Sequence, residues 1–256
     1  MTKLSAIGWR LASLGVGIVL VLLWQRIADA RLIPPVFLPG PDQAWASLIG
    51  GFDTGGLLPK LLATVLRMVY GWLLASLLGI AVGAAIGMSP AARAYVGPTL
   101  EFLRPLPAPA IIPLAIAFFG LSDAMVLGVI GFGALWPMLL ATMHGFAAVE
   151  PRLYEVARTL GMSRLGVVLK IALPSSLPDI LAGMRLGLTI ALILAVVGEM
   201  LTGQDGLGTW ILRAARSFHA ADLFAGVILL GLLGYLSSQL LSLVESRVLR
   251  WRPRAP

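Results

Sequence analysis

Apolar runs of about twenty residues recur along the chain, and each is long enough to cross the roughly 30 Å hydrocarbon core of a lipid bilayer. Of the 256 residues, 59% are hydrophobic and only 12% are charged, whereas a soluble domain of this length needs a larger charged surface. The sequence therefore predicts an all-α integral membrane protein with about six transmembrane helices, forming a single domain over residues 1–256. The predicted spans are residues 7–28, 61–88, 99–121, 124–146, 176–201 and 223–244.

The first run leaves two interpretations open. Ala28, Asp29 and Ala30 imitate a signal-peptide cleavage site, at which the run would be removed. Arg26 fits poorly directly before such a site, and the run is long enough to span a bilayer. We therefore expect a retained first span, with cleavage as the alternative.

Glycine and proline distinguish the second and third runs. The glycines of the run at 61–88 recur at four- and eight-residue spacing and share one helix face, where small residues permit close helix–helix approach in lipid. The run at 99–121 is interrupted by prolines, each of which removes a backbone donor. Such a segment is tolerated at membrane depth only where neighbouring helices or a water-lined cavity satisfy the freed carbonyls. The residues concerned are Gly71, Gly79, Gly83, Gly87, Pro105, Pro107, Pro109 and Pro113.

The positive charges predict the orientation of the spans. Six spans put both termini on one side, and in that arrangement twelve of the 19 Lys and Arg residues lie on the side of the termini and five on the other. The positive-inside rule makes the side with twelve cytoplasmic, so the loop at 147–175 is predicted to be cytoplasmic too. The twelve are Lys3, Arg10, Arg93, Arg104, Arg152, Arg158, Arg164, Lys170, Arg247, Arg250, Arg252 and Arg254.

This loop contains a short amphipathic segment. Pro151 suits a first helical position, and four apolar residues then follow the spacing of one helix face. Gly161 stands where a left-handed residue ends a helix, Ser163 can cap a second short helix, and Pro174 is expected to stop it. Periodicity alone leaves open whether the segment lies on the lipid surface or docks into a groove on another protein. The apolar stripe is Leu153, Val156, Ala157 and Leu160.

Residues 155–161 read EVARTLG, and residues 171–174, after nine intervening residues, read IALP. Together they resemble the EAA loop of ATP-binding-cassette (ABC) importer permeases, whose pattern is E-A-A-x3-G-x9-I-x-L-P. Val156 replaces the second alanine of that motif and still lies on the apolar stripe. Four further stretches look like the subgroup that imports aliphatic sulfonates, taurine or nitrate: LRPLPAPAIIPLAIAFFG, WPMLLATMHG, LPDILAGMRLGL and VVGEMLTG. The motif positions that match in type are Glu155, Ala157, Gly161, Ile171, Leu173 and Pro174.

The resemblance implies a type I ABC importer permease fold, with the amphipathic segment as the coupling helix seated in a groove of the ATPase. It implies a homodimer of permeases, two copies of a cytoplasmic ABC ATPase that bind ATP and Mg²⁺, and a periplasmic or extracellular solute-binding protein, at a bacterial cytoplasmic (inner) membrane. The sequence has no Walker motif, so the ATPase would be a separate chain and this chain no enzyme. Importers of thiamine precursors and pyrimidines share the motifs, so the substrate stays open. The implied coupling residues are Leu153, Glu155, Val156, Ala157, Arg158, Thr159, Leu160, Gly161, Ile171, Leu173 and Pro174.

Ionisable residues within the spans are candidates for the translocation pathway. Arg185 lies well inside the fifth predicted span, where a charge is costly unless it faces protein or water. It either meets an anionic substrate or pairs with another group of the helix bundle. Glu199, near the outer end of that span, is interpreted as a gate or a snorkelling residue, and Arg67 as a snorkelling residue or the partner of Glu199. Met184 and Leu188 flank Arg185 along the helix and complete the candidate pathway.

Two other classes of protein fit less well. A stand-alone ion-coupled secondary transporter or channel normally shows internal repeats or more acidic residues within its spans. An intramembrane enzyme needs a nucleophile–base set or a metal cluster, but the chain has no cysteine and only two histidines, of which His144 is interpreted as an interfacial residue. We therefore expect no catalytic residue, no metal site and no cofactor bound directly by this chain.

Overall fold

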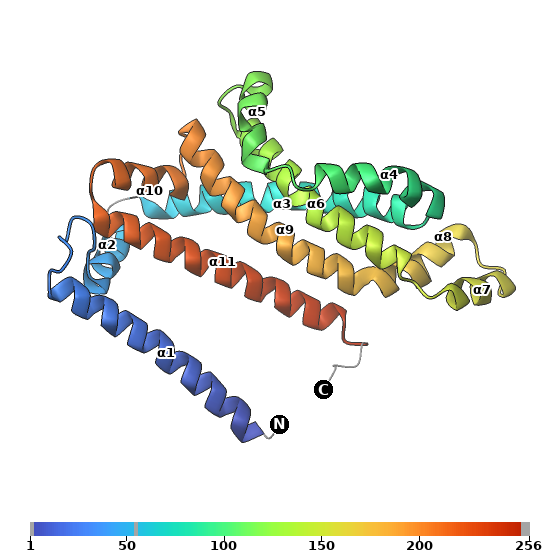
Figure 1. The fold of residues 1–256 in the computed structure, drawn as a ribbon, viewed down its shortest axis with the longest axis horizontal. Coiled ribbons are helices and arrows are strands. Elements are labelled where there is room, and N and C mark those ends of the chain that lie inside the picture. The colour runs from blue at the N-terminus through green and yellow to red at the C-terminus, as the bar shows by residue number, and fades with distance from the viewer. Residues whose placement is uncertain (1–2, 54–55, 252–256) are drawn as a thin grey trace.

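Four long helices lie side by side along the molecule in the computed structural model, which describes residues 3–53 and 56–251 (Figure 1). They are α3 (Leu57–Gly87), α6 (Asp123–Ala147), α9 (Leu173–Thr202) and α11 (Ala220–Val248). All four, α9 together with the helical turns that precede it, are long and apolar enough to cross a membrane. No β-strand occurs among the described residues, and the predicted all-α membrane class is confirmed.

A bent helical pair joins α3 to α6. Helix α4 (Pro90–Leu103) meets the segment formed by η1 (Ala108–Ile111) and α5 (Ile112–Phe119) at 84°, and the pair counts as a fifth candidate span if it crosses as one unit. The stretch at 99–121, expected as one span interrupted by prolines, is therefore divided between two helices. The break falls where prolines remove successive backbone donors, so an uninterrupted helix cannot form there.

Helix α1 (Lys3–Asp29) stands apart from the bundle in Figure 1 and reaches it near its own C-terminal end. There the indole N–H of Trp24 donates to the Pro39 carbonyl oxygen at 2.9 Å, and its ring lies 5.4 Å from that of Phe224 between centroids. Helix α2 (Pro41–Asp53) follows and packs against α11. The arrangement with six spans, α1 being the first, stays a prediction.

Both chain ends point in the same direction as the amphipathic segment. In Figure 1 the start of α1 and the end of α11 lie near each other, and both helices run from there to the end formed by α2 and α10 (Leu207–Arg216), away from α7 (Pro151–Thr159). Arg252 and Arg254, counted above for the orientation, lie outside the described residues.

The core lies where α6 is enclosed between α3 and α9. Gly71, Gly79, Gly83 and Gly87 of α3 are all buried, as expected for one contact face. At Gly79 a Cβ atom would lie 2.9 Å from Met138 Cβ and 3.1 Å from the Leu139 backbone nitrogen, which are closer than ordinary contacts. The glycine face therefore lets the backbones of α3 and α6 approach directly, the form of packing that stabilises helices in lipid.

The loop after α6 ends in an unusual helical turn. Helix α8 (Arg164–Val167) continues into the π-helix η2 (Val168–Ala172) and then into α9, so residues Arg164–Thr202 are one helical run. Pro174 was expected to stop the helix, and this expectation is wrong because Pro174 lies in the first turn of α9. The π turn widens the helix directly before the proline, where its ring and missing N–H would disturb regular α geometry.

We expect Gly79→Ala to lower the stability of the bundle by about 1–3 kcal/mol, because the added methyl group overpacks the α3–α6 contact. Thermal unfolding of the purified protein in detergent measures this change. The matched control is Gly231→Ala in α11, where a Cβ would meet no described atom within 4 Å. Alanine there should be neutral or stabilising by up to about 1 kcal/mol, since it favours helix over glycine. Equal effects of the two substitutions would contradict the packing argument.

Candidate functional site

The amphipathic segment forms a short helix with a defined beginning and end. Helix α7 starts at Pro151 and ends at Thr159, and Gly161 follows with φ 65°, in the left-handed region. The Gly161 and Met162 backbone N–H groups donate to the carbonyl oxygens of Arg158 and Ala157, both at 3.0 Å. This pair of bonds is the Schellman arrangement, which glycine accommodates without steric cost. The expected turn at Gly161 is therefore present, and it fixes the direction in which the chain leaves α7.

The two faces of α7 differ in what they contact. Ala157 is 1% exposed, and Tyr154 packs against the cluster that includes Phe146 and Val149. Burial raises the pKa of the Tyr154 hydroxyl, and the charge of Arg93 opposes that rise. Helix α7 is thus attached to the bundle by Tyr154 and Ala157, through one of its faces.

The adjacent face carries three apolar side chains without cover. Leu153, Val156 and Leu160 are 39%, 53% and 71% exposed. Ala157 was grouped with them in the predicted stripe, but the structure places it against the bundle. Tyr154, which the stripe omitted, is one helical turn before Ala157, so the spacing of these two residues was the signal for the attached face.

The remaining predicted coupling residues divide in the same way. Glu155, Arg158 and Thr159 are exposed on α7. Ile171 and Leu173 are partly buried against the cluster that also contacts Tyr154. A groove of about 930 Å³ runs between α7 and the start of α4, and Arg93, Arg158 and Arg164 are part of its lining.

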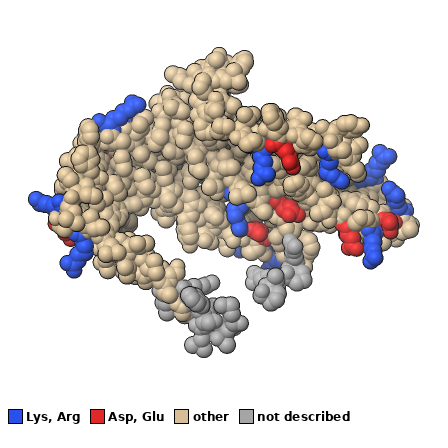
Figure 2. Space-filling view, viewed as in Figure 1, with Lys and Arg blue, Asp and Glu red and all other residues tan. Residues whose placement is uncertain are grey.

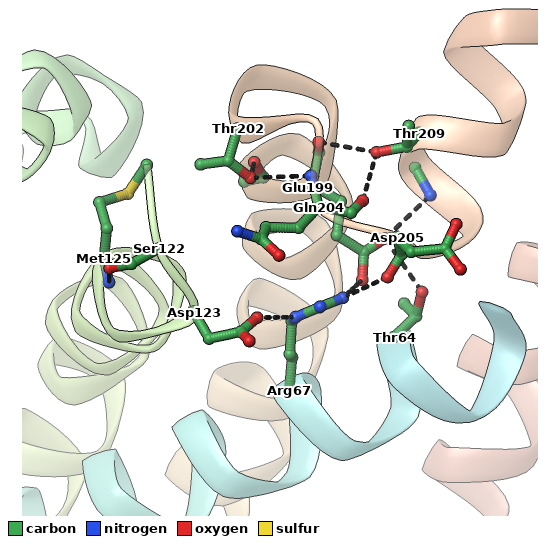
Figure 3. A network of polar contacts seen from close by, with 12 residues as sticks. Thr64, Arg67, Ser122, Asp123, Met125, Glu199, Thr202, Gln204, Asp205 and Thr209 are labelled. Carbon is green, nitrogen blue, oxygen red and sulfur yellow. Dashed lines mark hydrogen bonds and ion pairs between the residues drawn. The ribbon is translucent and has the colours of Figure 1, made fainter. Parts of the chain in front are cut away.

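A second polar site occupies the other end of the bundle, where Glu199 of α9 is fully buried (Figure 3). Its carboxylate accepts hydrogen bonds from Arg67 Nη1 at 3.0 Å, Thr64 Oγ1 at 3.0 Å and the Gly208 backbone N–H at 2.9 Å. Arg67 in turn pairs through Nε with Asp123 Oδ1 at 2.7 Å. Four helices, α3, α6, α9 and α10, therefore meet at one buried carboxylate and the arginine beside it.

This network settles where Arg67 and Glu199 lie. The expected pairing of Arg67 with Glu199 is present. Glu199 was interpreted as a gate or a snorkelling residue, but the structure places it in a closed site in which both carboxylate oxygens accept hydrogen bonds. A buried charge needs such partners because its desolvation is otherwise too costly. The sequence missed Asp123 as a second partner, although its place in the first turn of α6 exposes its carboxylate at that end.

The other pathway candidates are also held by protein contacts. Arg185 Nη2 forms an ion pair with Glu245 of α11, which is the structural alternative considered for it. The Met184 carbonyl oxygen accepts a hydrogen bond from the Trp72 indole at 2.9 Å, and Leu188 is 8% exposed within the main core. Met184 and Leu188 therefore lie between helices of one chain, whereas Arg185 is exposed beside its ion-pair partner.

The fold and the site define the membrane-embedded component of a transporter: a bundle of long apolar helices that carries an exposed amphipathic helix at one end. Residues 75–250, more than half of the chain, match the family of binding-protein-dependent transport system inner membrane components. The chain belongs to this family and is a permease component of an ABC importer.

Three permeases illustrate its relatives. The putative aliphatic sulfonates transport permease protein SsuC of Bacillus subtilis (strain 168) is 32% identical, over 91% of this chain and 85% of the relative. The taurine transport system permease protein TauC of Escherichia coli (strain K12) is 31% identical, over 93% and 89%. The nitrate import permease protein NrtB of Leptolyngbya laminosa is 30% identical, over 90% and 84%.

A solved structure supports the fold. A chain of the MetNI methionine ABC transporter, in an inward facing conformation, superposes with a TM-score of 0.65 at 18% identity, covering 77% of this chain and 96% of that one. At this identity the likeness concerns the fold alone. The expected ABC importer permease fold is confirmed.

We expect Glu199→Gln to lower the free energy of unfolding by about 3 kcal/mol, because the substitution leaves Arg67 with one less balancing charge in a buried site. Thermal or denaturant unfolding of the purified protein measures this loss. The double variant Arg67→Gln/Glu199→Gln should lose less than the sum of the single losses, since each single variant strands a partner. Glu101→Gln, which changes an exposed carboxylate of α4, is the control and should leave stability unchanged. Additive single effects would contradict the pairing.

Proposed function

We propose that this permease couples ATP hydrolysis by a separate ATPase to the import of a small anionic or polar solute, and that α7 is its coupling helix. The single observation that carries the proposal is the division of α7 into an attached face and an exposed apolar face. Leu153, Val156 and Leu160 have no partner among the described residues that would cover them, although they lie among charged residues.

The surroundings of α7 favour a protein partner over lipid. Figure 2 shows Lys, Arg, Asp and Glu gathered at the end of the molecule formed by α7 and α8, with both signs of charge mixed. A helix on an anionic lipid surface carries mainly basic residues on its polar face, whereas α7 presents Glu155 beside Arg152 and Arg158. An amphipathic helix with mixed charges around three apolar side chains suits a groove on a protein.

The backbone connects α7 to the spans through one short turn. The Schellman turn at Gly161 passes directly into α8, whose first turn is capped by Ser163 Oγ accepting from the Gly166 N–H at 3.2 Å. From α8 the chain is helical to the end of α9. A displacement of α7 by the ATPase would thus be transmitted to a transmembrane helix, and two ATPase states that contact α7 differently would favour two arrangements of the bundle.

The proposed assembly contains two copies of this permease, two cytoplasmic ATPase subunits that bind ATP and Mg²⁺, and a solute-binding protein on the outer side. Both chain termini would be cytoplasmic, as the distribution of Lys and Arg favours. The relatives named for aliphatic sulfonates, taurine and nitrate support a small anion or zwitterion as the solute. Which of these is transported depends on the solute-binding protein as well as on this chain.

We expect Leu160→Asp to abolish ATP-driven uptake while membrane insertion persists, because a carboxylate on the apolar face of α7 opposes burial in the ATPase groove. Uptake into proteoliposomes and co-purification of the ATPase are the measurements. Leu32→Asp, the same change at a similarly exposed leucine outside α7, is the control; Leu160 and Leu32 are 71% and 74% exposed. If Leu160→Asp transported at the control rate with the ATPase bound, α7 would not be the coupling helix.

A further inference from the structure

A cavity of about 600 Å³ lies between α6, α9 and the break that joins α4 to α5. Its wall is mainly apolar, and its lining includes Leu186 and Ile193 of α9, which are 61% and 55% exposed and mark its open side. Three polar side chains complete the lining: Arg104, Trp136 and His144. No carboxylate among the described residues lines it.

The indole of Trp136 is an unused donor in this wall. Its Nε1 atom is buried and has no hydrogen-bond partner among the residues that the structure describes. The indoles of Trp24 and Trp72, by comparison, each donate to a backbone carbonyl at 2.9 Å. A buried donor without an acceptor costs free energy, and an acceptor that reached the indole N–H would recover that cost.

The charge of the cavity is positive and unbalanced. Arg67 and Arg185 are each paired with carboxylates, whereas no carboxylate within the described ranges 3–53 and 56–251 lies within 4.0 Å of the Arg104 guanidinium. Arg104 supplies several N–H donors, and a ring nitrogen of His144 can supply another. Donors from an arginine, an indole and an imidazole around an apolar space favour an anion and oppose a cation.

We propose that this cavity is the permease's own binding site for a small organic oxyanion with a short apolar tail, of which an alkylsulfonate is the chemical type. The oxyanion head contacts Arg104 and the Trp136 N–H, and the tail lies against the apolar wall. This inference rests on the proposed function and names a substrate site for it. It also moves the pathway around α9, from Met184 and Leu188, which are packed between helices, to the side that carries Leu186 and Ile193.

The test observes the Trp136 indole N–H directly, in the full-length permease purified in detergent and labelled with ¹⁵N-tryptophan. Trp136→Phe assigns its resonance, and methanesulfonate is then titrated. We expect a saturable downfield shift at millimolar concentration, the range of a single small-ligand site. The neutral analogue dimethyl sulfone should not produce it. Each CH2 group added to the sulfonate should tighten binding about fourfold, because it buries further apolar surface.

Two variants separate the site from a general effect of the ligand. Arg104→Gln should weaken methanesulfonate binding about tenfold or more through loss of a charge-assisted hydrogen bond. Trp45→Phe removes an indole that is exposed on α2 and should leave the Trp136 response unchanged. The proposal is overturned if methanesulfonate causes no shift, if dimethyl sulfone causes the same shift, or if Arg104→Gln binds as the unmodified protein does. None of these measurements uses the ATPase, so their outcome is independent of the coupling test on Leu160.

Discussion

The hydrocarbon interior of a bilayer offers no water to a peptide group, and this constraint organises the whole molecule. Every backbone N–H and C=O at membrane depth must find a partner in the protein, so the chain is helical wherever it is apolar. Within the described spans, regular α-helix is interrupted or altered at two places, and a proline is involved at each. Prolines divide α4 from α5, and the freed backbone lies beside a cavity. A π turn lets one helical run include Pro174.

The same constraint explains the contrast between the two polar sites within the bundle. Around Glu199 each charged side chain has a partner and both carboxylate oxygens accept hydrogen bonds, so the site stabilises a junction of four helices. Around Trp136 one buried donor has no partner among the described residues, and the proposed ligand would supply its acceptor. A saturated network suits a structural role, and an unsaturated one suits recognition.

Features encoded by neighbouring residues could be predicted from the sequence, and features that depend on distant contacts could not. The glycine face of α3 and the turn at Gly161 follow from local spacing, and both are present. The side of α7 that carries Ala157 could not be assigned, because α7 has apolar residues on two faces and only the position of Phe146 and Val149 distinguishes them. Arg185 and Glu245 are separated by 60 positions in the chain. Their pairing follows from how α9 and α11 pack, which the pattern of either helix alone does not specify.

The π turn at η2 affects which side of α9 faces the neighbouring helices. Each residue of an α-helix advances the direction of its side chains by about 100°, and a π turn holds one extra residue. Removing one residue from Val168–Ala172 would therefore restore an ordinary α turn and leave α9 nearly in phase with α8. Removing one residue from a regular turn of α9 would instead rotate the rest of the helix by about 100°. The wall at Leu186 and Ile193 would then swing away from the cavity, and Glu199 would leave its partners on α3. The π turn thus accommodates one additional residue while the cytoplasmic helix, the cavity and the outer junction stay aligned.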